Sequence, residues 1–329
     1  MTDRPARPRV ALIDDWGGHM RDQAAWSRLD DVAEVVSVSD RLEGPLLAQR
    51  LHGFDVVVAN RERTRFDREL LGRLDTLRLL ATNGMRNAAI DLKAAAELGI
   101  EVCGTDTLGH PTAELAWALI LAWTRKLLEE AAAVRDGRWQ STLGRSLAGK
   151  VLGILGLGRI GSRMAVVGQA FGMDVIAHSR SLGPGEVAPC GATGASLHNL
   201  LASADVVSVH LPLNDHTRGL LDGAALSGMK PGSLLVNTAR AEIVDQNALI
   251  TALQEGPMAG AALDVFHDEP PSPGDPLRRL PNVLATPHLG YVVEDNYALA
   301  AEQTVDNIVG WLSGGERRTL TLKAGGTPQ

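Results

Sequence analysis

Three side chains in the second half of the sequence are of the kinds that could assist the reduction of a carbonyl group beside a carboxylate. A guanidinium can bind that carboxylate and polarise the adjacent C=O, and an imidazolium can protonate the alkoxide that forms. A neighbouring carboxylate can stabilise the protonated imidazole and fix its tautomer. The residues that offer these groups are Arg240, His288 and Glu269.

Each of the three residues follows a short apolar run that is typical of a buried β-strand. Ligands of open parallel sheets bind outside the carboxyl ends of the strands, so side chains there are candidates for a site. Taken singly, Arg240 could be a surface cation, Glu269 a solvated loop acid and His288 an ordinary loop residue. A common position at one sheet edge favours a shared reaction instead. The preceding runs are Leu234 to Val236, Ala261 to Val265 and Val283 to Ala285, respectively.

The elements that must position these residues alternate between strand-like and helix-like patterns. Apolar runs in the second half predict six strands, and helical spacing between them predicts crossover helices, which suits a doubly wound sheet. The strands are at 151–155, 175–177, 206–209, 234–236, 261–265 and 283–285, with helical segments at 163–171, 196–203, 223–227, 247–254 and 295–311.

The first half repeats the alternation, and the length of 329 residues also favours two domains. A long helical pattern from Pro111 to about Val134 predicts one helix that can bridge them. We expect an α/β fold with two Rossmann-like, doubly wound parallel-sheet domains. The strands of the first half are at 10–13, 35–38, 56–59, 77–81 and 100–103, with helical segments at 21–29, 45–51, 67–74 and 92–98.

The composition argues against several classes of partner. A net charge of −7 and 4% aromatic residues provide neither a basic stripe nor stacking platforms for nucleic acid. The most apolar stretch, Ala113 to Trp123, is too short to span a bilayer, and the first ten residues lack the apolar core of a signal peptide. We expect a cytoplasmic protein without membrane contact and with a disordered tail at 324–329. Cys103 and Cys190 lack CxxC spacing, so no disulfide framework or metal site is indicated.

The sequence GLGRIG directly follows the apolar run 151–155 and directly precedes a helical pattern. In that context Gly156 permits a tight turn, Gly158 lets a pyrophosphate approach the backbone, and Gly161 lets helix and strand pack closely. A purely structural glycine-rich turn is the alternative. The order of strand, glycines and helix favours a dinucleotide site.

The residues after the next strand bear on the choice between NAD(H) and NADP(H). An acidic residue there would bind the ribose 2′-hydroxyl and repel a 2′-phosphate. The run 175–177 is instead followed by His178, Ser179, Arg180 and Ser181. Hydroxyls and a guanidinium can hold a phosphate, so the sequence favours NADP(H). The alternative for Arg180 is a solvated turn residue.

Longer stretches of the sequence resemble the D-isomer-specific 2-hydroxyacid dehydrogenase family. The matching segments cover most of the second half and extend into the first. They are GKVLGILGLGRIG (149–161), VVSVHLPLNDHTRGLL (206–221), MKPGSLLVNTARAEIVDQNALITALQEG (229–256), ALDVFHDEPP (262–271) and NVLATPHLG (282–290), together with ATNGMRNAAID (81–91) and TAELAWALILA (112–122).

The resemblance implies particular domain boundaries and particular roles for the three residues. A discontinuous, flavodoxin-like substrate-binding domain is expected over 1–107 and 293–329, and a dinucleotide-binding Rossmann domain over 108–292. Arg240 is expected to anchor the substrate, and His288 to act as acid/base with Glu269 as its partner. A homodimer formed through the nucleotide-binding half is also implied.

The expected ligand contacts fall into two groups. For the cofactor they are Gly156, Gly158, Arg159, Ile160, Gly161, Ser179, Arg180, Ser181, His210, Leu211, Pro212, Thr217, Thr238, Ala239, Asp264, His288 and Gly290, with Asp264 meeting the nicotinamide carboxamide. For the substrate they are Asn83, Gly84, Met85, Arg86, Arg240, His288 and Tyr291, with the backbone near Met85 and Arg86 receiving the carboxylate.

The sequence also departs from the family pattern. The loop NGMRNAAID has fewer glycines than usual, and Arg86 in it either binds an extra anionic group or is solvated. Tyr291 stands where a small residue is common, which predicts a narrowed or aromatic-lined pocket. Ser179 replaces the Asp typical of NAD-preferring members. Glu269 argues against formate oxidation, because formate-oxidising relatives carry an amide there.

The leading hypothesis is therefore hydride transfer between NADP(H) or NAD(H) and a small 2-oxo or (R)-2-hydroxy acid such as glyoxylate or hydroxypyruvate. A dinucleotide-sensing scaffold, like the corepressors that resemble this family, is one alternative. Phosphite oxidation on the same scaffold is another. Rapid oxidation of NAD(P)H by a 2-oxo acid would separate the first two, and phosphite offered with the oxidised cofactor tests the third.

Overall fold

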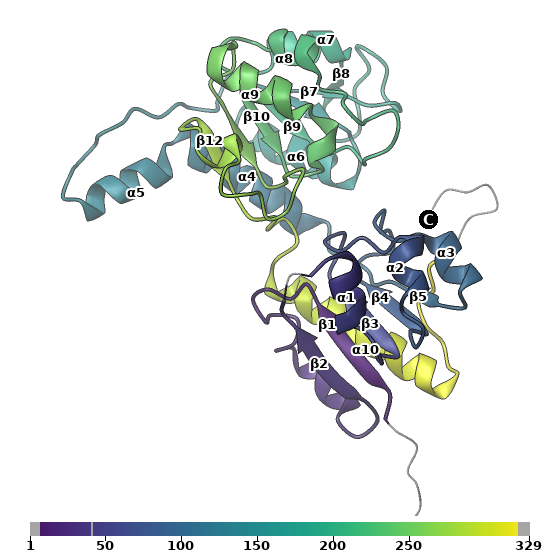
Figure 1. Cartoon of the computed structure of the whole chain (residues 1–329). Helices are drawn as coiled ribbons and strands as arrows, with labels where there is room; N and C mark the ends of the chain where they lie inside the picture. The colour runs from purple at the N-terminus through teal and green to yellow at the C-terminus, as the bar shows by residue number, and fades with distance from the viewer. Residues whose placement is uncertain (1–6, 41, 322–329) are drawn as a thin grey trace, which may run out of the picture. The chain divides into compact units, whose positions relative to one another are not determined.

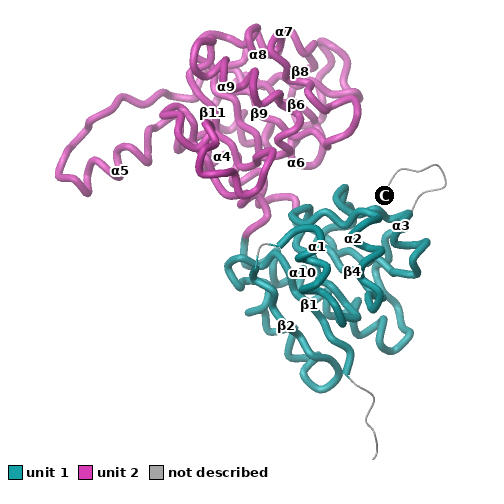
Figure 2. Tube along the Cα trace, viewed as in Figure 1, with its two compact units in different colours: residues 1–108, 293–329 teal, residues 109–292 magenta. Residues whose placement is uncertain are grey.

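Parallel strands form two separate sheets, and each sheet is the centre of one unit of the chain (Figures 1 and 2). The structure is a computed structural model that describes residues 7–40 and 42–321. Unit 1 contains the chain up to Leu108 and again from Val293, and unit 2 contains Gly109–Val292. The tail predicted at 324–329 lies outside the described residues. Two doubly wound sheets confirm the predicted α/β fold.

Unit 1 has a five-stranded parallel sheet in the order β2-β1-β3-β4-β5, the flavodoxin-like order. The strands β3 and β4 are buried along their whole length, as expected for parallel strands covered on both faces. The strands are β1 (Arg9–Ile13), β2 (Glu34–Val38), β3 (Val56–Ala59), β4 (Leu79–Thr82) and β5 (Glu101–Cys103), and the crossover helices are α1 (Gly44–Arg50), α2 (Arg68–Gly72) and α3 (Leu92–Glu97).

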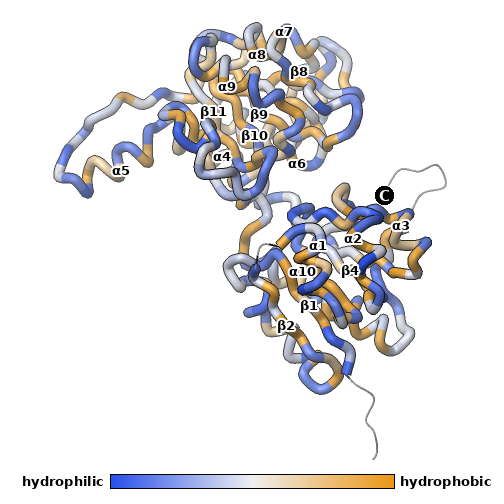
Figure 3. The backbone as a smooth tube through the Cα atoms, in the orientation of Figure 1, coloured by the Kyte–Doolittle hydropathy of each residue, from blue (hydrophilic) through white to orange (hydrophobic). Residues whose placement is uncertain are grey.

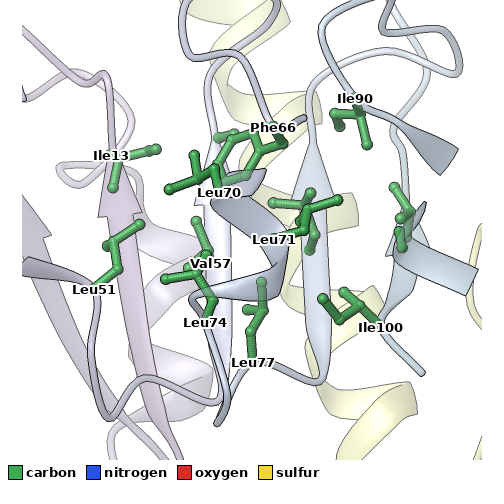
Figure 4. Packing of buried hydrophobic residues seen from close by; sticks show 14 of the residues in the cluster. Ile13, Leu51, Val57, Phe66, Leu70, Leu71, Leu74, Leu77, Ile90 and Ile100 are labelled. Carbon is green, nitrogen blue, oxygen red and sulfur yellow. The ribbon is translucent and has the colours of Figure 1, made fainter. Parts of the chain in front are cut away.

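The core of unit 1 lies on one face of this sheet, between the strands and the helices α1 to α3. Figure 4 shows Val57 of β3 among Leu70 and Leu71 of α2 and the adjoining Leu74. The other face packs against the 3₁₀-helix η1 (Ala24–Leu29) and α10 (Glu294–Ser313), which returns from the far end of the chain. Unit 1 is therefore discontinuous in sequence.

Three amide side chains of α10 bind the segment that leads out of unit 1. The amide oxygens of Gln303 and Asn296 accept from the backbone N–H groups of Asp106 (2.7 Å) and Leu108 (3.1 Å). Asn307 Nδ2 donates to the carbonyl oxygen of Gly104 (2.9 Å). The helix thus supplies hydrogen-bond partners to three backbone groups of this segment, of which the Gly104 carbonyl is buried.

Unit 2 has a seven-stranded parallel sheet in the order β12-β11-β10-β9-β6-β7-β8, whose reversal between β6 and β9 creates a topological switch point. The helices α7 to α9 cover one face, and α4 and α6 cover the other. The strands are β6 (Val151–Leu155), β7 (Asp174–His178), β8 (Thr193–Gly194), β9 (Val206–Val209), β10 (Leu234–Asn237), β11 (Gly260–Leu263) and β12 (Val283–Ala285).

Apolar sequence is concentrated in the strands and in the sides of the helices that face them (Figure 3). Among the residues that the structure describes, no helix combines the length and the apolarity that a membrane crossing requires. The helical elements of unit 2 are α4 (His110–Thr124), α5 (Leu127–Arg135), α6 (Arg159–Ala170), α7 (Leu197–Ser203), α8 (Gly223–Ser227), α9 (Gln246–Glu255), η2 (Ala241–Ile243) and η3 (Pro276–Arg278).

The prediction of one helix from Pro111 to Val134 was wrong, because the helix breaks between α4 and α5. Lys126 has a φ of +56°, in the left-handed region. The carbonyl oxygen of Thr124 accepts from the N–H of Arg145 (2.8 Å), a residue that returns to the helix end after a loop. Spacing of apolar residues cannot reveal such a competing hydrogen bond.

Two further local predictions also differ from the structure. The segment 21–29 is helical only as η1, because the Asp15 carboxylate accepts from the N–H groups of Met20 (3.0 Å) and Arg21 (2.8 Å) and holds them in a loop. The two-residue strand β8 was not predicted, since it contains no apolar run.

Candidate active site

The three glycines of GLGRIG, which follow β6 and continue into the first turn of α6, occupy three different environments. Gly156 has a φ of +95°, and a Cβ there would lie 2.7 Å from the carbonyl oxygen of His210. A Cβ on Gly161 would overlap the carbonyl oxygen of Gly156, so close packing of helix and strand requires glycine. A Cβ on Gly158 would meet nothing within 4 Å. The open space lies at the N-terminus of α6, where N–H groups can bind a phosphate.

A second helix N-terminus adjoins this turn. Helix α4 starts after Gly109, and neither α4 nor α6 has a side-chain cap. Arg159, the first residue of α6, lies so close that a Cβ on Gly109 would be 2.8 Å from its Cζ. Two uncapped helix N-termini and a guanidinium form a positive environment that fits a pyrophosphate. Ile160, the next residue, packs against the core between α4, α6 and the sheet.

The segment after β7 also starts beside the glycine turn, because the N–H of Gly156 donates to the carbonyl oxygen of His178 (2.9 Å). The hydroxyls of Ser179 and Ser181 lie 3.2 Å apart. Arg180 is exposed, and its guanidinium forms no hydrogen bond or ion pair within the described part of the chain. The segment presents two hydroxyls and a cation, and no carboxylate.

His210, at the end of β9, is a neutral histidine beside this turn. Its Nε2 lies 2.8 Å from the Ser208 hydroxyl, and its Nδ1 is buried without a partner among the described residues. Burial lowers the pKa of His210 to about 4. In the following loop, Leu211 packs against the core, and the Thr217 hydroxyl donates to the carbonyl oxygen of Pro212 (2.7 Å).

This low pKa makes His210 a source of acid sensitivity. An unfolded histidine binds a proton near pH 6.5, whereas folded His210 binds it near pH 4, so its stabilising contribution is complete above pH 6.5 and is lost as the pH falls toward 4. Between pH 7 and pH 5, we expect this difference in proton binding to lower the free energy of unfolding by about 2 kcal/mol.

Urea unfolding at both pH values measures the effect. His210→Gln should flatten the pH dependence, and His198→Gln, on the exposed side of α7, should leave it unchanged. An equal pH slope in His210→Gln and the unaltered protein would show that another group is responsible.

Arg240 is held at the end of β10 by a buried amide that the sequence analysis missed. Asn237 Oδ1 accepts from the N–H of Ala239 (3.0 Å), and Asn237 Nδ2 donates to the carbonyl oxygen of Arg240 (3.0 Å). The guanidinium of Arg240 donates to the carbonyl oxygen of Ala239 (2.6 Å). Thr238 Oγ1, between them, is buried without a partner among the described residues. An amide ending an apolar strand was the available sequence signal.

Glu269 and His288 form a direct pair. Glu269 Oε2 and His288 Nδ1 are 2.7 Å apart, and their side chains are 20% and 16% exposed. The other carboxylate oxygen, Oε1, accepts from the N–H of Phe266 (3.0 Å). The two contacts together fix the carboxylate and orient the imidazole through Nδ1, and Nε2 forms no hydrogen bond with the described residues.

Asp264, directly after β11, binds the loop that carries His288. Its carboxylate accepts from the Thr286 hydroxyl (2.6 Å) and from the N–H groups of Leu289 (2.7 Å) and Gly290 (2.9 Å). The residue is fully buried, and this desolvation raises its pKa. Tyr291, 6% exposed, packs with its ring edge-to-face against His288, with centroids 5.7 Å apart.

The predicted substrate loop follows β4 in unit 1. Gly84 has a φ of +98°, and its N–H donates to the Thr105 hydroxyl (3.1 Å). Asn83 Nδ2 donates to Asn60 Oδ1 (2.8 Å), whereas Met85 and Arg86 are exposed. Unit 2 thus contains the three predicted catalytic residues, with Glu269 and His288 in contact and Arg240 after the neighbouring strand β10, and the predicted substrate loop belongs to unit 1.

Comparison with known proteins identifies the family. Residues 117–290 match the model of the NAD-binding domain of D-isomer-specific 2-hydroxyacid dehydrogenases. Glyoxylate reductase of Aeropyrum pernix is 43% identical over 76% of this chain and 78% of its own. The chain belongs to the D-isomer-specific 2-hydroxyacid dehydrogenase family. The glyoxylate reductase of Thermococcus litoralis is 38% identical over the same shares.

A solved structure agrees with the fold of this 2-hydroxyacid dehydrogenase. Phosphoglycerate oxidoreductase of Vibrio cholerae O395 is 37% identical, with a TM-score of 0.89 over 94% of this chain and all of that one. The match to the family model contains Arg240, Glu269 and His288. These relatives favour a nicotinamide-dependent 2-hydroxyacid dehydrogenase over a dinucleotide-sensing scaffold or a phosphite-oxidising enzyme.

Proposed function

We propose that this 2-hydroxyacid dehydrogenase reduces glyoxylate or hydroxypyruvate to the corresponding 2-hydroxy acid. The observation that carries the proposal is the 2.7 Å contact between Glu269 and His288 in the unit that also holds Arg240 at a strand end. The glyoxylate reductases among its relatives support the substrate class. We assign dinucleotide binding to unit 2. We assign substrate binding to unit 1, through residues 83–86.

Arg240, His288 and Glu269 have different roles in the reduction. Arg240 binds the substrate carboxylate and draws electron density from the adjacent carbonyl oxygen. The hydride would come from a reduced nicotinamide held by unit 2. His288 donates a proton from Nε2 to the alkoxide oxygen, while Glu269 holds Nδ1 and balances the imidazolium charge.

The remaining cofactor residues divide by the part of the dinucleotide they would hold. Gly158, Arg159 and the two helix N-termini suit the pyrophosphate. Thr238 Oγ1 and His210 Nδ1, both buried without partners in the described chain, are polar groups available at the same sheet edge. We assign Asp264 a contact with the nicotinamide carboxamide, in addition to its hydrogen bonds with the loop that carries His288.

We assign the enzyme a preference for NADPH, supported by the two hydroxyls of residues 179–181 and by the Arg180 guanidinium, which is unpaired within the described chain. Ser179→Asp should reverse it, because a carboxylate repels the 2′-phosphate and accepts from a free 2′-hydroxyl. The ratio of kcat/KM for NADPH to that for NADH should fall at least tenfold, or about 1.4 kcal/mol.

Fluorescence titration of both cofactors provides the matching dissociation constants. Ser179→Asn is the control, since asparagine has the same size as aspartate but carries no charge. An equal change in both variants would assign the effect to shape rather than to electrostatics.

We also propose a cytoplasmic homodimer. Both described cysteines are free thiols, which suits a reducing compartment. In unit 2, α5 and the following loop to residue 146 stand away from the sheet as an arm (Figure 1). Glu130 of α5 connects the helix to the loop by accepting hydrogen bonds from the hydroxyls of Ser141 (2.9 Å) and Thr142 (2.7 Å). Large apolar side chains on the arm are exposed, and they are Leu127, Leu128, Val134, Trp139 and Leu143.

Solvated apolar groups on a fixed arm suit a second copy of the chain. Leu128→Asp combined with Leu143→Asp should weaken the dimer by roughly 10³-fold, since two buried interface anchors at about 2 kcal/mol each contribute about 4 kcal/mol. Light scattering after size exclusion should then report the 34.9 kDa monomer. Val187→Asp, at another exposed apolar residue of unit 2, should leave the dimer intact. A monomeric unaltered protein would refute the proposal.

Initial rates with a panel of 2-oxo acids test the function. Glyoxylate and hydroxypyruvate, each with NADPH and NADH, should give the highest kcat/KM, and pyruvate and phosphorylated hydroxypyruvate should be poorer. A strong preference for the phosphorylated acid would overturn the substrate assignment. Absence of turnover with every acid would overturn the reaction.

A further inference from the structure

His288 has a backbone conformation that its surroundings must maintain. Its φ is +54°, in the left-handed region, which is uncommon for a residue with a side chain and costs free energy. Such conformations persist when several contacts fix the loop. Asp264 supplies one group of contacts, to Thr286, Leu289 and Gly290.

Thr112 of α4 holds the same loop from the other side. Its hydroxyl donates to the carbonyl oxygen of Gly290 (2.8 Å). A Cβ on Gly290 would lie 3.3 Å from Asp264 Oδ2 and 3.4 Å from Thr112 Cγ2. The buried Gly290 is therefore enclosed by these two side chains, with its N–H bound to one and its carbonyl bound to the other.

We propose that Thr112 is a positioning residue for His288, and that the first turn of α4 thereby takes part in carbonyl reduction. The inference rests on the proposed role of His288 as proton donor. Only Leu289 separates His288 from Gly290, so rotation of the Gly290 peptide changes the direction of the imidazole. A displacement of about 1 Å in a reacting group can reduce a rate by as much as 10²-fold.

The hydrogen bond also joins the two ends of unit 2. Gly109 is the first residue of the unit and Val292 is the last, and Thr112 and Gly290 lie within three residues of them. A shift of either end therefore acts on the loop of His288. The segment TAELAWALILA, which begins with Thr112, thus contributes a side chain to the site as well as a core helix.

Thr112→Val tests the proposal because it removes the hydroxyl and keeps the shape. We expect kcat to fall about tenfold, while the KM for the 2-oxo acid and the dissociation constant of NADPH change less than twofold. Thr112→Ser, which keeps the donor, should restore kcat to within twofold of the unaltered enzyme.

A second threonine of α4 provides the matched control. The Thr124 hydroxyl donates to the carbonyl oxygen of Ile120 (2.7 Å), within the helix itself. Thr124→Val should lower thermal stability and leave kcat unchanged. An equal fall of kcat in Thr112→Val and Thr124→Val, or a Thr112→Ser enzyme as slow as Thr112→Val, would overturn the proposal.

NMR of ¹³C-labelled histidine separates this inference from the proposed function. The chain has nine histidines, and the His288 resonance is assigned by its loss in His288→Asn. It should shift or broaden in Thr112→Val and stay unchanged in Thr124→Val. Unchanged resonances in Thr112→Val would refute positioning. A shifted resonance together with full activity of His288→Asn would refute the catalytic role alone.

Discussion

Replacing His288 by Asn should lower kcat for 2-oxo acid reduction by about 10²–10⁴-fold, the range of a lost general acid. The asparagine amide can still donate a hydrogen bond, but it cannot release a proton to the alkoxide. The dissociation constant of NADPH should change little, because the glycine turn and the helix N-termini remain. Steady-state rates at saturating cofactor and a fluorescence titration measure the two effects.

His198→Asn is a suitable control, because it changes an exposed histidine of the same unit. Glu269→Gln should give an intermediate loss, since an amide can hold Nδ1 but does not balance the imidazolium charge. If His288→Asn kept kcat within threefold, proton donation would have to come from elsewhere.

Arg240→Lys should reduce kcat/KM for the 2-oxo acid by about 10²-fold, with most of the loss in KM. A guanidinium binds a carboxylate through two parallel N–H groups, and an ammonium cannot reproduce that geometry. The lost charged hydrogen bond is worth about 3 kcal/mol, which corresponds to the stated factor. Lysine also cannot donate to the Ala239 carbonyl and to a ligand in the same way.

The matched control for this change is Arg218→Lys, at an exposed arginine of unit 2. Rates measured over a range of 2-oxo acid concentrations separate kcat from KM. A loss confined to kcat would argue that Arg240 acts on the transition state without anchoring the ground-state carboxylate.

Much of the fold could be predicted because parallel strands buried on both faces produce continuous apolar runs. The runs at 151–155, 206–209 and 283–285 match β6, β9 and β12 in their bounds. The break after Thr124 could not be predicted, since it depends on a hydrogen bond from Arg145. The strand β8 is too short to carry a pattern.

The site was predictable to the extent that its residues follow strands directly. Arg240, Glu269 and His288 are in loops that continue from β10, β11 and β12, so strand prediction was sufficient to find them. The supporting groups escaped prediction because they act through backbone atoms. Asn237 and Thr112 bind the carbonyl oxygens of residues 240 and 290. The position of Asn237 at a strand end is visible in the sequence, but the backbone partners of both side chains are not.

The route of the chain through unit 1 has a consequence during protein synthesis. The last strand of its sheet ends at Cys103, but α10, which covers one face, begins only at Glu294. Roughly 190 residues must be translated in between, which takes about 10–40 s at ordinary ribosomal speeds. Unit 2 is continuous in sequence and is synthesised within that interval, before α10 is made. The nascent first sheet meanwhile exposes an apolar face, so a chaperone that shields newly made chains has its natural target there.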